Sequence, residues 1–191
     1  KNGINASGVK NLLGTFAAPA AVVNDLSFLS TLPPALLGDG MAEALKVAII
    51  RDRDFFLFLS QHAGSLRQGD PELLAAMVER SARIHLDHIR GGGDPFELGG
   101  SRPLDFGLWS AHYLESRSGY TLRHGEAVAI GLALDTCYAA RLGLLSREER
   151  DAVLEILARA GLKVWHPLLS RREPDGSLAV GQGLEEFREH L

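Results

Sequence analysis

The 191-residue chain contains a single cysteine, Cys137, which excludes an internal disulfide bond and a zinc site built from several thiolates. No apolar stretch reaches the roughly 18–20 residues that a transmembrane helix needs, and no secretory signal is visible. Basic residues are not in excess, because 20 Lys and Arg stand against 24 Asp and Glu for a net charge of −4. We therefore expect a cytoplasmic protein that binds neither nucleic acid nor a membrane.

The composition is typical of a soluble globular protein, with 46% hydrophobic and 23% charged residues. A chain of this length can bury one substantial core. The sequence opens at Lys1 without a methionine, so we expect it to be a piece of a longer protein.

Helical patterns dominate after the first 25 residues. Asp70 suits a helix N-cap, Pro71 suits the first helical position, and Ser146 with Glu149 forms a capping box. Helices are predicted over Asp39–Arg51, Asp54–Leu66, Asp70–Ile89, Pro103–Ser116 and Glu126–Leu142, then from Ser146 until Gly161, with a short last helix near Glu185–His190.

Glycine, proline and asparagine mark the irregular segments. Loops are predicted over Lys1–Lys10, Arg90–Arg102 and Tyr120–Gly125, and one short strand over Pro19–Asp25, where two valines stand between proline and Asn-Asp. The predicted fold class is mainly α. We expect a single domain over 1–191, with a loop and short strand in 1–25, a helical core in 26–165 and a tail in 166–191.

Glu43 and Lys46 lie three residues apart on one face of an apolar helix. A carboxylate in that setting needs a partner: an ion pair with Lys46, a metal, or a water-filled cleft. The alternative is a partly exposed pair at the edge of the helix. Spacing alone leaves both interpretations open.

Histidines form the other candidate sites. His124 precedes a long apolar helix, where it either points into a cleft or caps the helix beside Glu126. His112 follows Asp105 by about two helical turns, which predicts that Asp105, Leu108 and His112 lie on broadly one side of a helix. That pair is either acid/base machinery or a cap and a core histidine. His85 and His88 form a further i, i+3 pair that more often marks a polar face.

Taken in order, several segments resemble one family. KNGINASGVKNLLGTFAAP is similar to GGKxGxNxxxGKNLIGxFxQP, and FLSTLP with GMAEALKVAII is similar to FLxTLP and GxAEVIKYGxI. LDFGLWSAHYLE resembles LNFGHTFGHAIE, and GYTLRHGEAVAIG resembles GYxxxHGEAVAIG. By these motifs, which run from Lys1 to about Leu144, the chain resembles a divergent branch of the 3-dehydroquinate synthase (sugar phosphate cyclase) family.

The resemblance implies a fold and an activity. The chain would be the helical C-terminal domain of the dehydroquinate-synthase-like fold, without the nucleotide-binding α/β domain. The implied enzyme is a lyase, a homodimer that uses NAD and a divalent metal, zinc or cobalt, to eliminate phosphate from a phosphorylated C7 ketose and close a carbocycle. This chain alone is expected to be inactive.

The resemblance also implies roles for particular residues. Glu43 and His124 match metal ligands, His112 matches a proton-transfer histidine, and Lys46 and Asn11 match substrate contacts. The positions implied near NAD and the substrate phosphate are Lys1 and Lys10, and those lining the nucleotide are Phe28, Leu29, Ser30 and Thr31. Asp105, Arg102 and His85 stand at or near substrate positions where the family has asparagine, arginine and lysine.

The departures from the family pattern matter for function. Leu108 stands where the family has a metal-binding histidine, and leucine cannot coordinate a metal, so the site is expected to be weakened. His112 could be borrowed as a ligand, and would then be lost to proton transfer. Asp105 and His85 favour a less acidic, hydroxyl-rich substrate, because a buried carboxylate accepts from hydroxyl groups. Alternatives are a non-catalytic binding or assembly protein, and a related iron-dependent alcohol or glycerol dehydrogenase.

Overall fold

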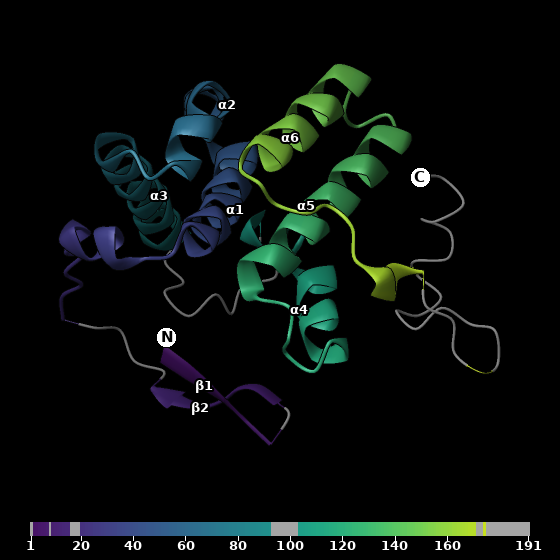
Figure 1. Ribbon diagram of the computed structural model, residues 1–191, viewed down its shortest axis with the longest axis horizontal. Coiled ribbons are helices and arrows are strands. Elements are labelled where there is room, and N and C mark those ends of the chain that lie inside the picture. The colour runs from purple at the N-terminus through teal and green to yellow at the C-terminus, as the bar shows by residue number, and fades with distance from the viewer. Residues whose placement is uncertain (1, 8, 16–19, 93–102, 171–173, 175–191) are drawn as a thin grey trace.

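The computed structural model describes residues 2–7, 9–15, 20–92, 103–170 and 174, which carry a mainly helical fold (Figure 1). A hairpin of β1 (Asn2–Ala6) and β2 (Val9–Thr15) comes first. The α-helices of the described residues are α1 (Pro34–Arg51), α2 (Arg53–Arg67), α3 (Pro71–Gly92), α4 (Leu108–Arg117), α5 (His124–Arg141) and α6 (Arg147–Arg159). Short 3-10 helices are η1 (Leu26–Thr31), η2 (Pro103–Asp105) and η3 (Pro167–Leu169).

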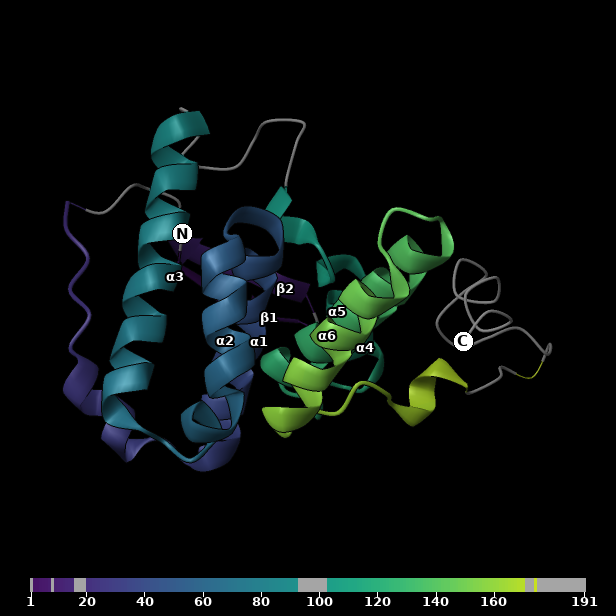
Figure 2. The same cartoon turned by 90° about the horizontal axis from the view of Figure 1, so that it is seen from above.

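The helices form two groups, α1–α3 and α4–α6, which meet where α1 packs against α5 (Figures 1 and 2). Every residue of α5 from Ala127 to Leu134 is buried. A helix that is apolar on all sides belongs in the interior, and α5 is accordingly the central helix. The peripheral α2 instead buries a single stripe of residues, which comprises Phe55, Leu59, Ala63 and Leu66. The predicted mainly α class is confirmed.

Local signals for helix ends are also confirmed. The Asp70 carboxylate accepts hydrogen bonds from the backbone N–H groups of Glu72 and Leu73, so it caps α3 as predicted. The capping box of Ser146 and Glu149 begins α6. After α6, Gly161 has a φ of 76°, which is the left-handed conformation expected of a glycine just past a helix.

Two predictions for the first 25 residues are wrong. Lys1–Lys10 was expected to be a loop, but β1 and β2 pair in antiparallel register with Ile4 opposite Leu13. The turn between them needs few residues because Ser7 adopts a positive φ of 50°. Of the expected strand, Ala20–Asp25 has no regular structure, and its two valines lie on the surface rather than in a sheet. Asp25 instead caps η1 by accepting the N–H of Ser27.

Three helix boundaries also differ from the predictions. The first helix begins at Pro34, where proline is well suited to a first helical turn, and not at Asp39. The predicted Pro103–Ser116 helix is broken at Gly107, whose φ is 76°. His124 and Gly125 belong to the first turn of α5 and not to a loop, because Glu126 reaches back to accept the N–H of Arg123. The first three residues of the loop predicted over Arg90–Arg102 are instead helical, because α3 continues to Gly92. The rest of that loop and the helix near Glu185–His190 lie outside the described residues.

A glycine contact fixes α4 against α5. The backbone carbonyl of Gly107 lies against Gly131 in the middle of α5, so closely that a Cβ atom on Gly131 would overlap with its oxygen. Two glycines therefore allow the two helix backbones to approach each other more closely than side chains would permit. Within the described residues, no helix is long and apolar enough to cross a membrane.

We predict that Gly131→Ala destabilises the protein by about 1–3 kcal/mol, because the added methyl group forces α4 away from α5. The matched control is Gly64→Ala in α2, where no atom lies within 4 Å of the added Cβ. That control is expected to gain about 0.5–1 kcal/mol from its helix propensity. Urea unfolding measures both changes, and equal stabilities for the two variants would show that the glycine contact is absent.

Candidate metal centre

His124, the first residue of α5, stands between two carboxylates from two other helices. Its Nε2 atom is 2.9 Å from Oε1 of Glu43 on α1, and its Nδ1 atom is 3.1 Å from Oε2 of Glu115 on α4. A carboxylate oxygen accepts a hydrogen bond from an imidazole N–H, and which nitrogen of His124 carries the proton depends on its tautomer. The three residues join α1, α4 and α5 at a single point.

Packing on the Glu43 side holds His124 in place. The Cα and Cβ atoms of Asp39 on α1 occupy the space where a side chain on Gly125 would lie, so the start of α5 touches α1 directly. Arg123 pairs with Asp39 at 2.7 Å and with Glu126 at 2.9 Å. Since Asp39 and Glu43 are one helical turn apart, these contacts bring His124 to the level of Glu43.

Glu43 has the partners that its apolar helix required. The Lys46 ammonium, whose side chain is only 8% exposed, is 2.7 Å from Glu43 Oε2. Partial burial raises the pKa of Glu43, but the hydrogen bond from His124 and the charge of Lys46 outweigh it and lower the pKa to about 2. Of the partners left open for Glu43, the structure shows the ion pair with Lys46, with Glu43 itself partly exposed, and Glu43 is ionised at any physiological pH.

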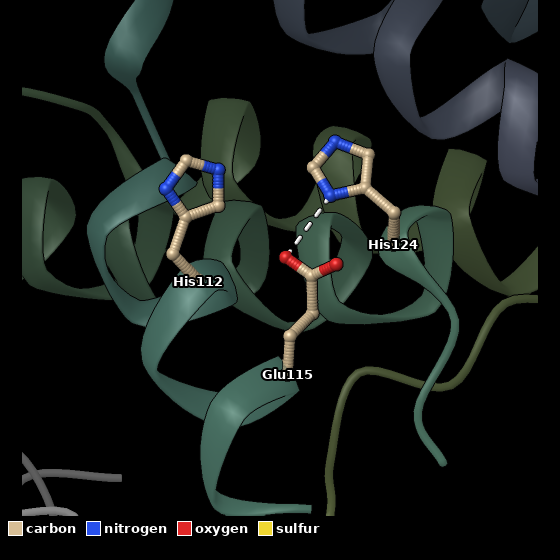
Figure 3. Close-up of side chains that lie close together, drawn as sticks. All are labelled: His112, Glu115 and His124. Carbon is tan, nitrogen blue, oxygen red and sulfur yellow. Dashed lines mark hydrogen bonds and ion pairs between the residues drawn. The ribbon is translucent and has the colours of Figure 1, made fainter. Parts of the chain in front are cut away.

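Glu115 is the residue that sequence reasoning missed. It lies three residues after His112 on α4 and is only 6% exposed, although it carries a carboxyl group. The signal that could have revealed it is the i, i+3 spacing in the segment HYLE, which places Glu115 on the same face of the helix as His112. His112, Glu115 and His124 each offer one atom that could bind a metal, and these three atoms lie within 4.8 Å of one another (Figure 3).

His112 lies beside His124 as a neighbouring ring. The two imidazole centroids are 5.9 Å apart and their planes differ by 29°, so the rings are stacked. The predicted helical relation between His112 and Asp105 does not hold, because Asp105 belongs to η2 and Gly107 interrupts the helix between them. Leu108 begins α4 and packs against the apolar core, and a leucine side chain offers no ligand atom to a metal.

Asp135 anchors the beginning of α4. Its Oδ2 atom accepts the backbone N–H of Gly107 at 2.6 Å, and its carboxylate also bonds the Trp109 side chain. Burial raises the pKa of Asp135 despite these two hydrogen bonds. Because Gly107 directly precedes α4, Asp135 and the Gly107–Gly131 contact together set where His112 and Glu115 lie relative to α5.

Two further predicted site residues line a pocket together with Glu43. Leu29, Glu43 and His85 line a cavity of about 410 Å³ between η1, α1 and α3. The rest of the FLST segment is exposed, and the hydroxyls of Ser30 and Thr31 donate to backbone carbonyls of their own 3-10 helix. His88 is not brought to this pocket and lies 2.8 Å from the guanidinium of Arg51.

The remaining predicted residues are only partly described. Phe28 is 67% exposed at η1. Lys10 and Asn11 lie in β2, and the structure describes only the backbone of these two residues. Lys1 and Arg102 fall outside the described residues. Their predicted roles remain predictions.

Comparison with known proteins shows the family of this chain. The family model of the 3-dehydroquinate synthase C-terminal domain matches residues 40–179, which include Glu43, His112, Glu115 and His124. The chain belongs to the 3-dehydroquinate synthase family. The model of the family's N-terminal domain matches residues 1–38, a segment that includes the hairpin and η1.

Two kinds of synthase match this chain in sequence. A 3-dehydroquinate synthase of Pseudomonas aeruginosa is 38% identical over 100% of this chain and 48% of its own length. A 2-epi-5-epi-valiolone synthase of Streptomyces albus is 36% identical over 100% of this chain and 47% of its own length. The chain therefore spans about half the length of the relatives it matches.

A solved structure agrees with the fold. ValA, a 2-epi-5-epi-valiolone synthase of Streptomyces hygroscopicus subsp. jinggangensis solved with NAD+ and Zn2+ bound, matches with a TM-score of 0.82 and 31% identity. The match covers 98% of this chain and 51% of that chain. The helical domain predicted from the sequence is thereby confirmed as a domain of this family.

The low pKa of Glu43 predicts how stability depends on pH. Because its folded pKa of about 2 lies below the ordinary value of 4.5, Glu43 stabilises the fold above pH 4.5, and this contribution is lost as the pH falls toward 2. Its side chain is 39% exposed, so we expect no more than about 1 kcal/mol.

The measurement is urea unfolding with EDTA present, at pH 7 and at pH 3. The stability difference between the wild type and Glu43→Gln should shrink at the lower pH, because the unfolded wild-type chain takes up a proton at Glu43 below pH 4.5 while the folded protein, with a pKa of about 2, does not. An unchanged difference would contradict the pairing of Glu43 with Lys46 and His124.

Proposed function

We propose that the protein is an NAD- and metal-dependent sugar phosphate cyclase, which eliminates phosphate from a phosphorylated C7 ketose and closes a carbocyclic ring. The observation that carries the proposal is His124 held between Glu43 and Glu115 at the meeting point of three helices. Glu43 also lines the neighbouring pocket, so a substrate in that pocket would reach the same carboxylate. The homodimer implied by the resemblance and the cytoplasmic location expected from the composition remain predictions.

The donor atoms around His124 fit a divalent metal. Imidazole nitrogen and carboxylate oxygen are both zinc ligands, and the ValA structure contains Zn2+. We propose that His124 and Glu43 hold the metal, with Nδ1–H of His124 still donating to Glu115. Such a carboxylate behind a ligating histidine fixes its tautomer and raises its basicity. Metal bound there would polarise the reacting oxygens of the substrate and lower the pKa of the hydroxyl that is oxidised.

The residues of this chain would bind and orient the substrate. Lys46 neutralises Glu43 and presents a cation next to it, where substrate oxygens can be bound. Asn11 and Asp105 are the further substrate contacts implied by the family, with Arg102 and His85 at the family's cationic positions. Lys1, Lys10 and the segment Phe28–Thr31 would face NAD, which supplies the redox chemistry of the reaction. His112 takes either the proton-transfer role implied by the family or the ligand role left open by Leu108.

Two substitutions favour a substrate without a carboxylate. His85 replaces a lysine of the family motif, and Asp105 replaces an asparagine. An extra carboxylate repels an acidic substrate and accepts hydrogen bonds from hydroxyl groups. The 2-epi-5-epi-valiolone synthases and the 3-dehydroquinate synthases are similarly identical to this chain, so overall identity does not choose between their substrates. We propose a less acidic, hydroxyl-rich ketose phosphate that carries no carboxylate.

A second candidate is a family member that has lost turnover and serves in binding or assembly. Leu108 is the observation that favours it, because its position in the family motif belongs to a metal-binding histidine. The matching family model is that of the 3-dehydroquinate synthases, so it does not support a third function, that of an iron-dependent dehydrogenase.

The test is phosphate release by the full-length protein with Zn2+ or Co2+ and NAD, screened against C7 sugar phosphates. We expect release from a ketose phosphate that lacks a carboxylate, and a loss of at least about 100-fold in His124→Ala, because the metal's several kcal/mol of transition-state stabilisation is removed. The control is His88→Asn, which should keep wild-type turnover. Protein that binds metal and NAD but releases no phosphate from any of these substrates would favour the binding protein.

A further inference from the structure

The half-site formed by Glu43 and His124 lacks a third protein ligand. Catalytic zinc sites in proteins keep three protein ligands and one open position. Leu108 cannot supply the third, since its side chain packs into the apolar core and carries no donor atom. If the protein binds metal, as the proposed function requires, another residue near His124 has to complete the site.

His112 is in the right place to do so. It lies one helical turn after Leu108 on α4, so it projects from nearly the same side of the helix. Its ring is stacked on that of His124, and one of its nitrogen atoms lies within 4.8 Å of a possible ligand atom of His124 and of one of Glu115, a group that does not include Glu43. Ligand atoms around a tetrahedral zinc ion are about 3.3 Å apart. For His112 to coordinate the same ion as His124, its exposed side chain would have to rotate toward His124.

We propose that His112 is the third protein ligand of the metal, in place of the histidine that is missing at Leu108. The proposal rests on the proposed function for the presence of a metal, and it extends that function by assigning the ligand. The resulting set has two histidines and a carboxylate, which is one of the sets found in catalytic zinc sites.

The assignment has a consequence for proton transfer. An imidazole that gives a lone pair to a metal cannot use the same nitrogen to accept a substrate proton. The proton-transfer role implied for His112 by the family therefore passes to another group, and His112 becomes a residue that sets metal affinity.

The position of α4 supports the same role. Asp135 accepts the N–H of Gly107 just before α4, and the Gly107 carbonyl rests against Gly131 of α5. The helix that carries His112 is thus fixed at its beginning to the helix that carries His124. A ligand on a helix held in this way loses little conformational freedom when it binds a metal.

The test measures metal binding directly, without reference to turnover. Zn2+ affinity is determined by competition with a chelator for the full-length wild type, His112→Asn and the control His88→Asn. His88 is a histidine of α3 that lies against Arg51, away from the centre. We expect His112→Asn to weaken Zn2+ binding at least 10-fold and His88→Asn to leave it unchanged. An affinity of His112→Asn within 2-fold of the wild type would overturn the proposal.

A second variant guards against a general loss of structure. Leu108→His in the His112→Asn background restores a histidine at the family position, and we expect it to recover most of the lost affinity. The absorption spectrum of bound Co2+ should change in His112→Asn and return in the double variant, because its visible bands report the ligands around the ion. Circular dichroism checks that each variant is folded. A weakened His112→Asn whose cobalt spectrum stays that of the wild type would also overturn the assignment.

The outcomes also separate this inference from the proposed function. If the wild-type protein releases phosphate but its metal affinity does not depend on His112, the cyclase proposal stands and the assignment of His112 as a ligand is wrong. Metal binding that does depend on His112, with no phosphate release, would keep the ligand and remove the cyclase.

Discussion

The centre depends on one constraint: the imidazole of His124 is held from both sides by carboxylates on two different helices. Glu43 fixes Nε2 and Glu115 fixes Nδ1, so the ring cannot turn without breaking a hydrogen bond. Under the proposed function, a divalent cation bound beside His124 adds positive charge, which favours the oxyanion that forms when a substrate hydroxyl is oxidised.

Close backbone contacts between helices make that constraint possible. At Gly125 the start of α5 touches Asp39 of α1, and at Gly131 the middle of α5 touches the turn before α4. These two contacts lie on the same helix and set α1 and α4 in position around it. The ion pair of Arg123 with Asp39 adds a polar link on the exposed side, where its own contribution to stability is small. Packing between the helices therefore sets the positions of the site residues, and the charged side chains lie within that frame.

Much of the fold could be predicted because its signals are local. Caps such as Asp70 and Ser146 act within one helical turn, and the apolar run of α5 indicates an interior helix without reference to any neighbour. The errors arose where the structure depends on distant pairing. Two valines favoured a strand before η1, yet the described part of the chain has no strand that pairs with them. The glycine- and asparagine-rich first residues form a strand because β2 lies opposite.

The candidate site was predictable in a similar way. Glu43 and His124 came from the family motifs, and Lys46 from its spacing to Glu43. Glu115 was missed because the spacing of a helix does not say which of its faces packs against His124. The break at Gly107 was missed because its cause, contact with Gly131, lies 24 residues further along the chain.

The most direct test is anomalous X-ray diffraction at the zinc edge from crystals of the full-length protein grown with Zn2+. The account predicts a zinc peak about 2.1 Å from an imidazole nitrogen of His124. A fully occupied zinc ion bound elsewhere, with no peak at His124, would contradict it.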